Sequence, residues 1–240
     1  MTRRLAFARE LVTAKIRNQR TMLRRNWRGP EDERAPLIAR LARLAESAGR
    51  ADAMPVLLGL EGEAAALYFR AVPRLFTGKV ANLPAFQFVN RNRRPPADPV
   101  NACLSLAYAV LTRTFSAALA IVGLDPWKGL YHVERPGRPA LALDLIEPFR
   151  PVLADSAVLM ALNNGELGPT DFVFAAGGCN LKPAARRTLI SAYERRLDQE
   201  TTHPVFGYQV SMRRLIHVQA RLLARFLLGE IPAYPHYIPR

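Results

Sequence analysis

The sequence predicts a mainly α-helical protein, and three observations carry that prediction. Apolar residues recur at intervals of three and four along most of the chain, whereas the alternation typical of strands is scarce. Proline and glycine divide the chain into segments of helical length. Half of the 240 residues are hydrophobic, which is ample for a sizeable core. We therefore expect an all-α, multi-helix fold in a single domain over residues 1–240, with an extended tail over residues 230–240.

Each expected helix has its own start or stop signal. The first ends before Gly29-Pro30, the second ends before Gly49, and Pro55 begins the third. Asp98 is suited to cap the long fourth helix, and Gly229 follows the last one. Residues 77–99 are irregular, and residues 170–174 fit either a strand or a helix. The predicted helices span residues 5–26, 35–48, 55–76, 100–122, 151–162, 182–200 and 210–228.

The charge of the chain predicts a polyanionic partner. Lys and Arg number 34 against 20 Asp and Glu, which gives a net charge of +14. Such an excess favours nucleic acid as the partner. A biased genome would explain the preference for arginine over lysine, but it would not explain the sign of the imbalance.

Cysteine content and hydropathy bear on the compartment. Only Cys103 and Cys179 occur, without metal-ligand spacing, so we expect a reduced, cytoplasmic compartment. Residues 103–124 form the most apolar window, but Arg113 interrupts it, so we expect a buried helix there and no membrane span. The arginine-rich start resembles a transit peptide in composition, yet it continues into a basic helix without a cleavage signal.

Three side chains that could ligate a metal lie close together in the sequence. His132 precedes Asp144 and Glu147, which are three residues apart and share a face if the segment is helical. With Asp144 as N-cap, Pro148 falls in the first turn, where a missing N–H costs little. A lone histidine is more often structural than a ligand, but its position just before two acids favours a metal site.

Glu61 is a fourth candidate, far upstream. At helical spacing it shares a stripe with Leu57, Ala64 and Tyr68, so its carboxylate lies on a face that is otherwise apolar. Glu63 is turned away from that stripe, toward Arg70 and solvent. A buried carboxylate needs a partner, which could be a metal or one of the many arginines. Spacing alone does not decide between these two alternatives.

Candidate DNA contacts come from two basic segments and one polar helix face. Arg91, Arg93 and Arg94 lie among prolines that restrict the backbone; a solvated linker is the usual meaning of such a run. Arg214 and Arg221 belong to a basic stripe on the last predicted helix, which is a phosphate track or only a solvated face. Asn101 begins a row of polar residues that borders a site or is satisfied within the core.

Several blocks resemble a known family. They are AKIRNQR, LLGLEGEAAALYF, RNRRPPADPVNACLSLAYAVL and VGLDPWKGLYHVERPGRPALALDLIEPFRP. Together and in this order they resemble the CRISPR-associated integrase of the spacer-acquisition complex, a metal-dependent DNA endonuclease. The resemblance implies that Mg²⁺ or Mn²⁺ is held by Glu61, His132 and Glu147. Asp144 is then a nearby carboxylate that either supports these ligands or serves as an alternative ligand.

The resemblance also implies a reaction and partners. Family members join a short DNA prespacer to a CRISPR repeat by attack of a 3′-hydroxyl, in antiviral defence. They act as homodimers with a small ferredoxin-like partner dimer. The family begins with a β-rich domain, whereas this sequence opens on the helical part, so we expect a truncated gene, a cloned piece or part of a fusion. Such a chain should be deficient in two-ended integration.

Two other function classes fit some of the same residues. A non-catalytic basic helical DNA-binding or scaffolding protein would explain the charge and the helices. A general metal-dependent phosphohydrolase would explain the acids but not the arginine tracks. Metal binding that depends on Glu61 and His132 separates the enzyme from the non-catalytic alternative.

Overall fold

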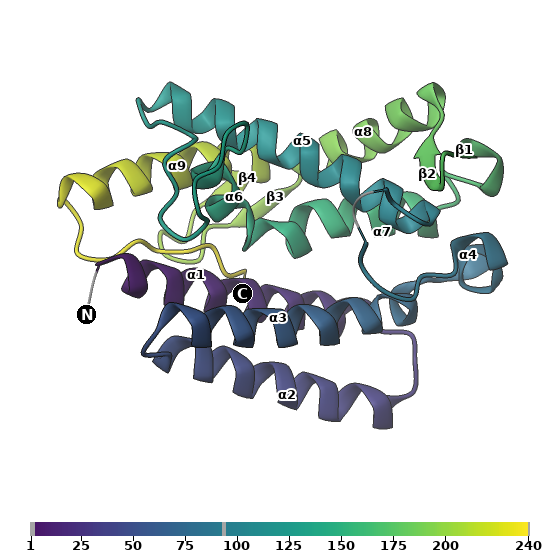
Figure 1. Ribbon diagram of the computed structural model, residues 1–240, viewed down its shortest axis with the longest axis horizontal. Helices are drawn as coiled ribbons and strands as arrows, with labels where there is room; N and C mark the ends of the chain where they lie inside the picture. Colours follow the sequence, from purple (N-terminus) through teal and green to yellow (C-terminus); the bar gives the residue numbers. More distant parts are fainter. Residues whose placement is uncertain (1–2, 93–94, 240) are drawn as a thin grey trace.

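The computed structural model describes residues 3–92 and 95–239. Within those residues the chain forms nine α-helices and four short strands, so the predicted mainly α-helical class is confirmed (Figure 1). The α-helices are α1 (Arg3–Asn26), α2 (Glu31–Arg50), α3 (Met54–Ala71), α4 (Gly78–Asn82), α5 (Pro99–Ile121), α6 (Ala140–Ile146), α7 (Ser156–Asn163), α8 (Pro183–Asp198) and α9 (Met212–Leu228). Shorter turns are the 3₁₀ segments η1 (Val72–Leu75), η2 (Pro84–Phe86) and η4 (Pro169–Asp171), and the π-helix η3 (Arg150–Asp155).

Two groups of helices enclose the core. The helices α1, α2 and α3 pack against one another on one side, and α5 packs with α8 and α9 on the other (Figure 1). The π-helix η3 contacts both α1 and α5, so it joins the two groups. Buried apolar side chains from Phe7 to Tyr237 form one connected cluster. The segment from α6 through η3 to α7 therefore crosses the centre of the molecule.

The strands form two antiparallel hairpins. In the first, β1 (Phe172–Ala175) pairs with β2 (Gly178–Leu181), so the segment that fits either a strand or a helix by sequence is a strand after the 3₁₀ turn η4. In the second, β3 (Glu200–Thr202) pairs with β4 (Gln209–Ser211). Val210, the predicted start of the last helix, lies in β4 instead.

Capping residues mark both ends of α9 and the start of α5. The Asp98 side chain accepts a hydrogen bond from the Asn101 N–H at 2.8 Å, which confirms the predicted cap of α5. Gly229 ends α9 with φ of +82°, as predicted. The helix α2 begins at Glu31, earlier than predicted, and has three acids in its first turn that favour a helix N-terminus.

The prediction that Asp144 caps a helix is wrong. The helix α6 begins at Ala140, and Asp144 lies inside it. The carboxylate instead receives backbone N–H groups from residues 130–132. Asp144 is therefore a completely buried residue within α6 that binds the preceding loop, and it does not cap a helix.

The long apolar helix α5 and the C-terminal tail complete the core. Among the described residues, α5 alone is long and apolar enough to cross a membrane, a test that a core helix also passes. It packs against α6, α7, α8 and α9. The tail lies on α1, where Tyr234 packs on Phe7 at a ring distance of 5.6 Å and the Tyr237 carbonyl accepts from Asn18 at 2.9 Å.

Candidate metal and DNA site

Three of the predicted site residues line one cleft of about 860 Å³. Glu61 comes from α3, His132 from the loop before α6, and Glu147 from the turn that follows α6. Lys15 of α1 and Arg150 of η3 also line this cleft. Five separate segments therefore place acids, an imidazole and cations around one space that opens to solvent.

Asp144 lies beneath the cleft and fixes the His132 loop. Its Oδ2 accepts the N–H groups of Leu130 and Tyr131 at 2.7 and 3.0 Å. Its Oδ1 accepts the His132 N–H at 2.8 Å and lies 2.7 Å from His132 Nδ1. With the proton on Nδ1, the ring donates to Asp144 and its Nε2 lone pair faces the cleft. His132 Nε2 lies 3.8 Å from Glu147 Oε1.

Lys15 bridges the two glutamates. Its Nζ lies 2.6 Å from Glu61 Oε1 and 2.6 Å from Glu147 Oε2. Burial lowers the pKa of Lys15, but the carboxylates of Glu147 and Glu61 outweigh burial and raise the pKa above its ordinary value. The ammonium is therefore charged. The ionic partner of Glu61 is thus a lysine, and not one of the arginines that the sequence suggested.

The remaining contacts of Glu61 and Glu63 separate these two acids. The Tyr131 hydroxyl donates to Glu61 Oε2 at 2.6 Å, so both oxygens of Glu61 have partners. Glu63, which was expected to face Arg70 and solvent, pairs with Arg40 at 2.5 Å on the surface. Only Glu61 of this pair lines the cleft.

Glu147 is an ionised carboxylate in a buried position. Burial raises its pKa, but the positive charges of Arg150 and Lys15 outweigh burial and lower the pKa to about 2. Arg150 Nη2 lies 3.1 Å from Glu147 Oε1. Glu147 Oε2 has no well-aligned hydrogen bond, because the Lys15 contact is close enough for an ion pair but lacks hydrogen-bond geometry. This oxygen therefore retains acceptor capacity.

A buried polar network continues from Arg150. The Arg150 guanidinium lies 4.6 Å from the ring centroid of Tyr108. The hydroxyls of Tyr108 and Tyr68 donate to the two oxygens of Asp155 at 2.6 and 2.8 Å. Burial raises the pKa of Asp155 to about 6, against the hydrogen bonds of the two tyrosines. Through these contacts Tyr68 and Tyr108 hold both ends of the π-helix η3, Arg150 and Asp155, in place beside the cleft.

The predicted DNA contacts are dispersed. Asn101 is fully buried, and its side-chain amide donates to the Asn90 carbonyl and the Asp98 carboxylate, so it cannot touch DNA in this conformation. Arg91 donates to Asn101 Oδ1 at 2.7 Å and to Ser105 at 3.0 Å, so this polar face of α5 is satisfied within the protein. Arg93 and Arg94 lie outside the described residues.

The basic stripe of α9 is exposed. Arg214 and Arg221 both lie on the solvent side of that helix. Neither side chain forms an ion pair within the described part of the chain, whereas the neighbouring Arg213 is paired with Glu194 and Asp198 at 2.6 and 2.9 Å. Both arginines therefore remain available to an external phosphate.

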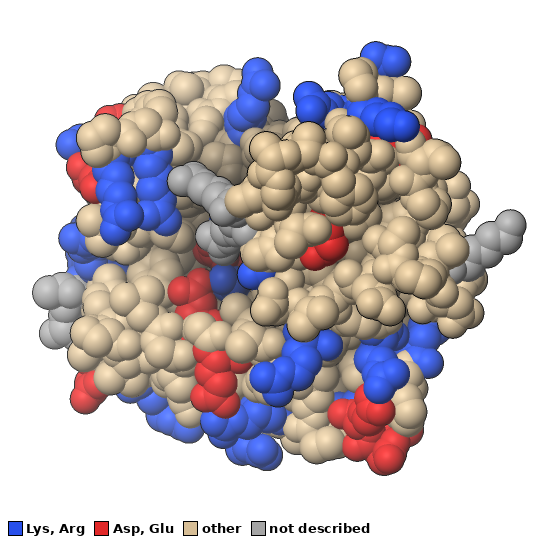
Figure 2. Space-filling view, turned by 45° about the vertical axis from the view of Figure 1, so that its right-hand side comes forward, with Lys and Arg blue, Asp and Glu red and all other residues tan. Residues whose placement is uncertain are grey.

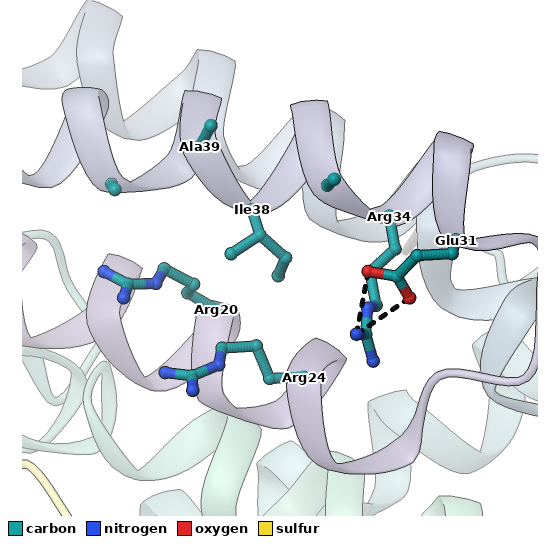
Figure 3. A pocket seen from close by; sticks show the side chains of 8 residues that line it. Arg20, Arg24, Glu31, Arg34, Ile38 and Ala39 are labelled. Carbon is teal, nitrogen blue, oxygen red and sulfur yellow. Dashed lines mark hydrogen bonds and ion pairs between the residues drawn. The ribbon is translucent and has the colours of Figure 1, made fainter.

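Further positive charge lies elsewhere on the surface. On the face drawn in Figure 2, Lys and Arg form several separate groups with Asp and Glu between them. A second cleft of about 500 Å³ lies between α1 and α2. In Figure 3, Arg20 and Arg24 of α1 lie beside Ile38 of α2, and Arg34 and Glu31 pair at the other end. This cleft contains no acid–imidazole set.

The residues that complete the site are not among those predicted from the sequence. Lys15, Tyr131 and Arg150 all contact the candidate ligands. Lys15 does lie in the AKIRNQR block, and it is one of only four lysines beside thirty arginines. A lysine on the buried face of the first predicted helix was therefore a signal that could have been followed.

The protein-family model described as CRISPR associated protein Cas1 matches residues 1–195. A Cas4/Cas1 exonuclease–endonuclease fusion from Rhodospirillum rubrum is 76% identical over 99% of this chain, which spans 41% of that protein. A Cas1 endonuclease from Thermus thermophilus is 43% identical over 100% of this chain and 68% of its own length. A chain in a partial Cas6-RT-Cas1–Cas2 complex has a TM-score of 0.83 and 26% identity, over 99% of this chain and 69% of that one.

Proposed function

The chain belongs to the Cas1 family, and we propose that its cleft is the catalytic site of a metal-dependent DNA endonuclease or integrase. The observation that carries this proposal is the meeting of Glu61, His132 and Glu147 in one open cleft. They come from three segments that the sequence separates by 71 and 15 residues. The names of the two relatives as Cas1 endonucleases support the same activity.

The chemistry of the donors fits a hard divalent cation. Glu61 and Glu147 offer carboxylate oxygens, and His132 offers Nε2, a mixed set that suits Mg²⁺ or Mn²⁺ with water completing the shell. Glu147 Oε2 contacts the Lys15 ammonium without hydrogen-bond geometry, so it keeps acceptor capacity in this set. Among the described residues, no three acidic, histidine or cysteine side chains already surround one point at ligating distance. Lys15 Nζ stands between the two glutamates instead.

The protein's own residues would bind and orient the DNA. Bound Mg²⁺ or Mn²⁺ would supply positive charge to the scissile phosphate and to the attacking oxygen. Arg135 and Arg138 also line the cleft, and their guanidinium groups suit phosphate oxygens. Asp144 holds the His132 ring, and Arg150 holds the Glu147 carboxylate, so both candidate ligands keep their direction.

The proposed substrate is DNA with a free 3′-hydroxyl. Attack of that hydroxyl on a phosphate of a CRISPR repeat forms one phosphodiester and breaks another, whose 3′-oxygen leaves and takes up a proton. Water in place of the hydroxyl gives cleavage. We further propose a homodimer and a small partner of the Cas2 type, because a chain similar to this one occurs in a Cas1–Cas2 complex.

One observation favours the alternative of a non-catalytic DNA-binding or scaffolding protein. Lys15 and Arg150 already supply cationic partners to the carboxylates of Glu61 and Glu147. A structural cluster of ion pairs would need nothing more. Metal binding decides between the two functions, since a structural cluster has no need of a divalent cation.

The test measures metal binding and DNA chemistry in matched variants. His132→Ala and Glu147→Gln should each weaken Mn²⁺ binding in calorimetry and lower metal-dependent cleavage or strand joining about a hundredfold or more, because each removes a ligand. Far-UV circular dichroism should stay helical. Glu63→Gln is the control, since Glu63 lies on α3 near Glu61 but does not line the cleft. Full activity in either ligand variant, or no Mn²⁺ binding by the unsubstituted chain, would overturn the proposal.

A further inference from the structure

Lys15 is a buried cation held between two carboxylates that come from other parts of the chain. Its side chain is 11% exposed, and those of Glu61 and Glu147 are 15% and 4% exposed. Both carboxylate contacts of Nζ are 2.6 Å long. The ammonium thus occupies the space through which the two candidate metal ligands face each other.

The choice of lysine at this position suits a small, movable charge. The chain uses thirty arginines and only four lysines. A guanidinium is a planar fork, whereas an ammonium is a compact charge on a flexible four-carbon stem. A compact charge can enter the gap between two carboxylates and can leave it by rotation of the stem. Lys15 also lines the open cleft, so space for such a rotation exists next to it.

Electrostatics make Lys15 and a divalent cation competitors. Two carboxylates close together repel each other unless a cation lies between them. Lys15 meets that need in the present conformation. A dication bound to the same oxygens would lie within a few ångströms of the ammonium and repel it strongly in this buried setting. Both cations cannot share the position.

We propose that Lys15 is a positioning residue: a tethered counter-ion that holds Glu61 and Glu147 together in the metal-free protein and leaves this position when Mg²⁺ or Mn²⁺ binds. The inference rests on the proposed metal site. In this role Lys15 keeps the two ligands assembled. The measured metal affinity is then lowered by the free energy needed to displace the Lys15 ammonium from the carboxylates. The released ammonium then faces the cleft, where it can meet a DNA phosphate.

Lys15→Met tests the competition because it keeps most of the stem and removes the charge. In the presence of a chelator, the variant should melt at a lower temperature, since the carboxylates lose their counter-ion. Its affinity for Mn²⁺ in calorimetry should rise about tenfold or more, because no ammonium has to be displaced. A purely structural Lys15 gives the opposite sign, with weaker Mn²⁺ binding in a loosened site.

Lys128→Met is the matched control, since Lys128 is an exposed lysine that pairs with Glu134 at 3.3 Å outside the cleft. It should change neither the melting temperature nor Mn²⁺ affinity. Unchanged or weaker Mn²⁺ binding by Lys15→Met would overturn the role of Lys15 alone. Absence of Mn²⁺ binding by the unsubstituted chain would instead overturn the proposed metal site.

A second measurement needs no substitution and covers the case in which Lys15→Met does not fold. With only four lysines, isotope labelling of lysine gives four side-chain signals. Titration with diamagnetic Mg²⁺ should move the Lys15 signal toward that of a solvated ammonium and leave the Lys128 signal in place. A Lys15 signal that stays unchanged at saturating Mg²⁺ would refute the displacement.

Discussion

Titration of the buried Asp155 should make the unfolding free energy of the protein depend on pH, and replacing Asp155 by asparagine should remove that contribution. Asp155 is 6% exposed, and its pKa is raised by burial from 3.8 to about 6. Because the folded-state pKa lies above that of the unfolded chain, folding favours protonated Asp155. This stabilising contribution is complete below about pH 3.8 and is lost as the pH rises through about 6.

The magnitude follows from the size of the pKa change. A shift of two units corresponds to roughly 3 kcal/mol of unfolding free energy. The asparagine side chain in the variant would stay neutral at every pH, and its amide can still pair with the hydroxyls of Tyr68 and Tyr108. Relative to the unsubstituted protein, Asp155→Asn should therefore gain on the order of 3 kcal/mol as the pH rises from about 4 to about 7.

Urea unfolding followed by circular dichroism at several pH values measures this gain. Groups that titrate equally in both proteins, such as Glu147, cancel in the difference between the two curves. Asp52→Asn serves as the control, since Asp52 is exposed. A constant difference between Asp155→Asn and the unsubstituted protein over this range would show that Asp155 is ionised throughout and that the reasoning from burial is wrong.

Two further predictions concern metal and DNA. Asp144→Asn should weaken Mn²⁺ binding in calorimetry about 10- to 100-fold, because His132 loses the carboxylate that orients its ring; an unchanged affinity would mean that the backbone alone sets the ring. Replacing Arg214 and Arg221 by glutamine should reduce the slope of log affinity for DNA against log salt by about 0.7 to 0.9 for each phosphate that is no longer neutralised. Arg213→Gln is the control, because Arg213 is already paired with Glu194 and Asp198. If the slope is the same with and without Arg214 and Arg221, DNA binds elsewhere on the protein.

The helical body was predictable because its signals are local. Asp98 caps α5 through a neighbour three residues away, and Gly229 ends α9 through its own backbone conformation. The start of α2 was misjudged because periodicity of apolar residues begins only after the acidic turn at Glu31. Local chemistry thus predicts the elements, with errors of a few residues at their ends.

The roles of buried polar side chains were harder to predict, since they depend on partners that are distant in sequence or lie in irregular segments. Asp144 looked like a helix cap, but its partners are backbone groups 12 to 14 residues earlier, in the His132 loop. Asn101 looked like a DNA contact, but its buried amide donates to the Asn90 carbonyl and the Asp98 carboxylate. Periodicity identifies a face as polar without showing whether protein or solvent covers it.

The burial of Lys15 could be predicted from residue spacing, but its partners could not. Helical period places it on the same side of α1 as Leu11 and Met22, which are buried, so its burial could have been deduced. Its partners lie 46 and 132 residues further along the chain, and only the packing of α1 against α3 and η3 brings them to it. A buried lysine requires nearby acids, and two acids predicted to share a metal require positive charge when the metal is absent. The two needs are complementary, so a buried lysine and an unpaired acidic set in one sequence should be considered together as a single site.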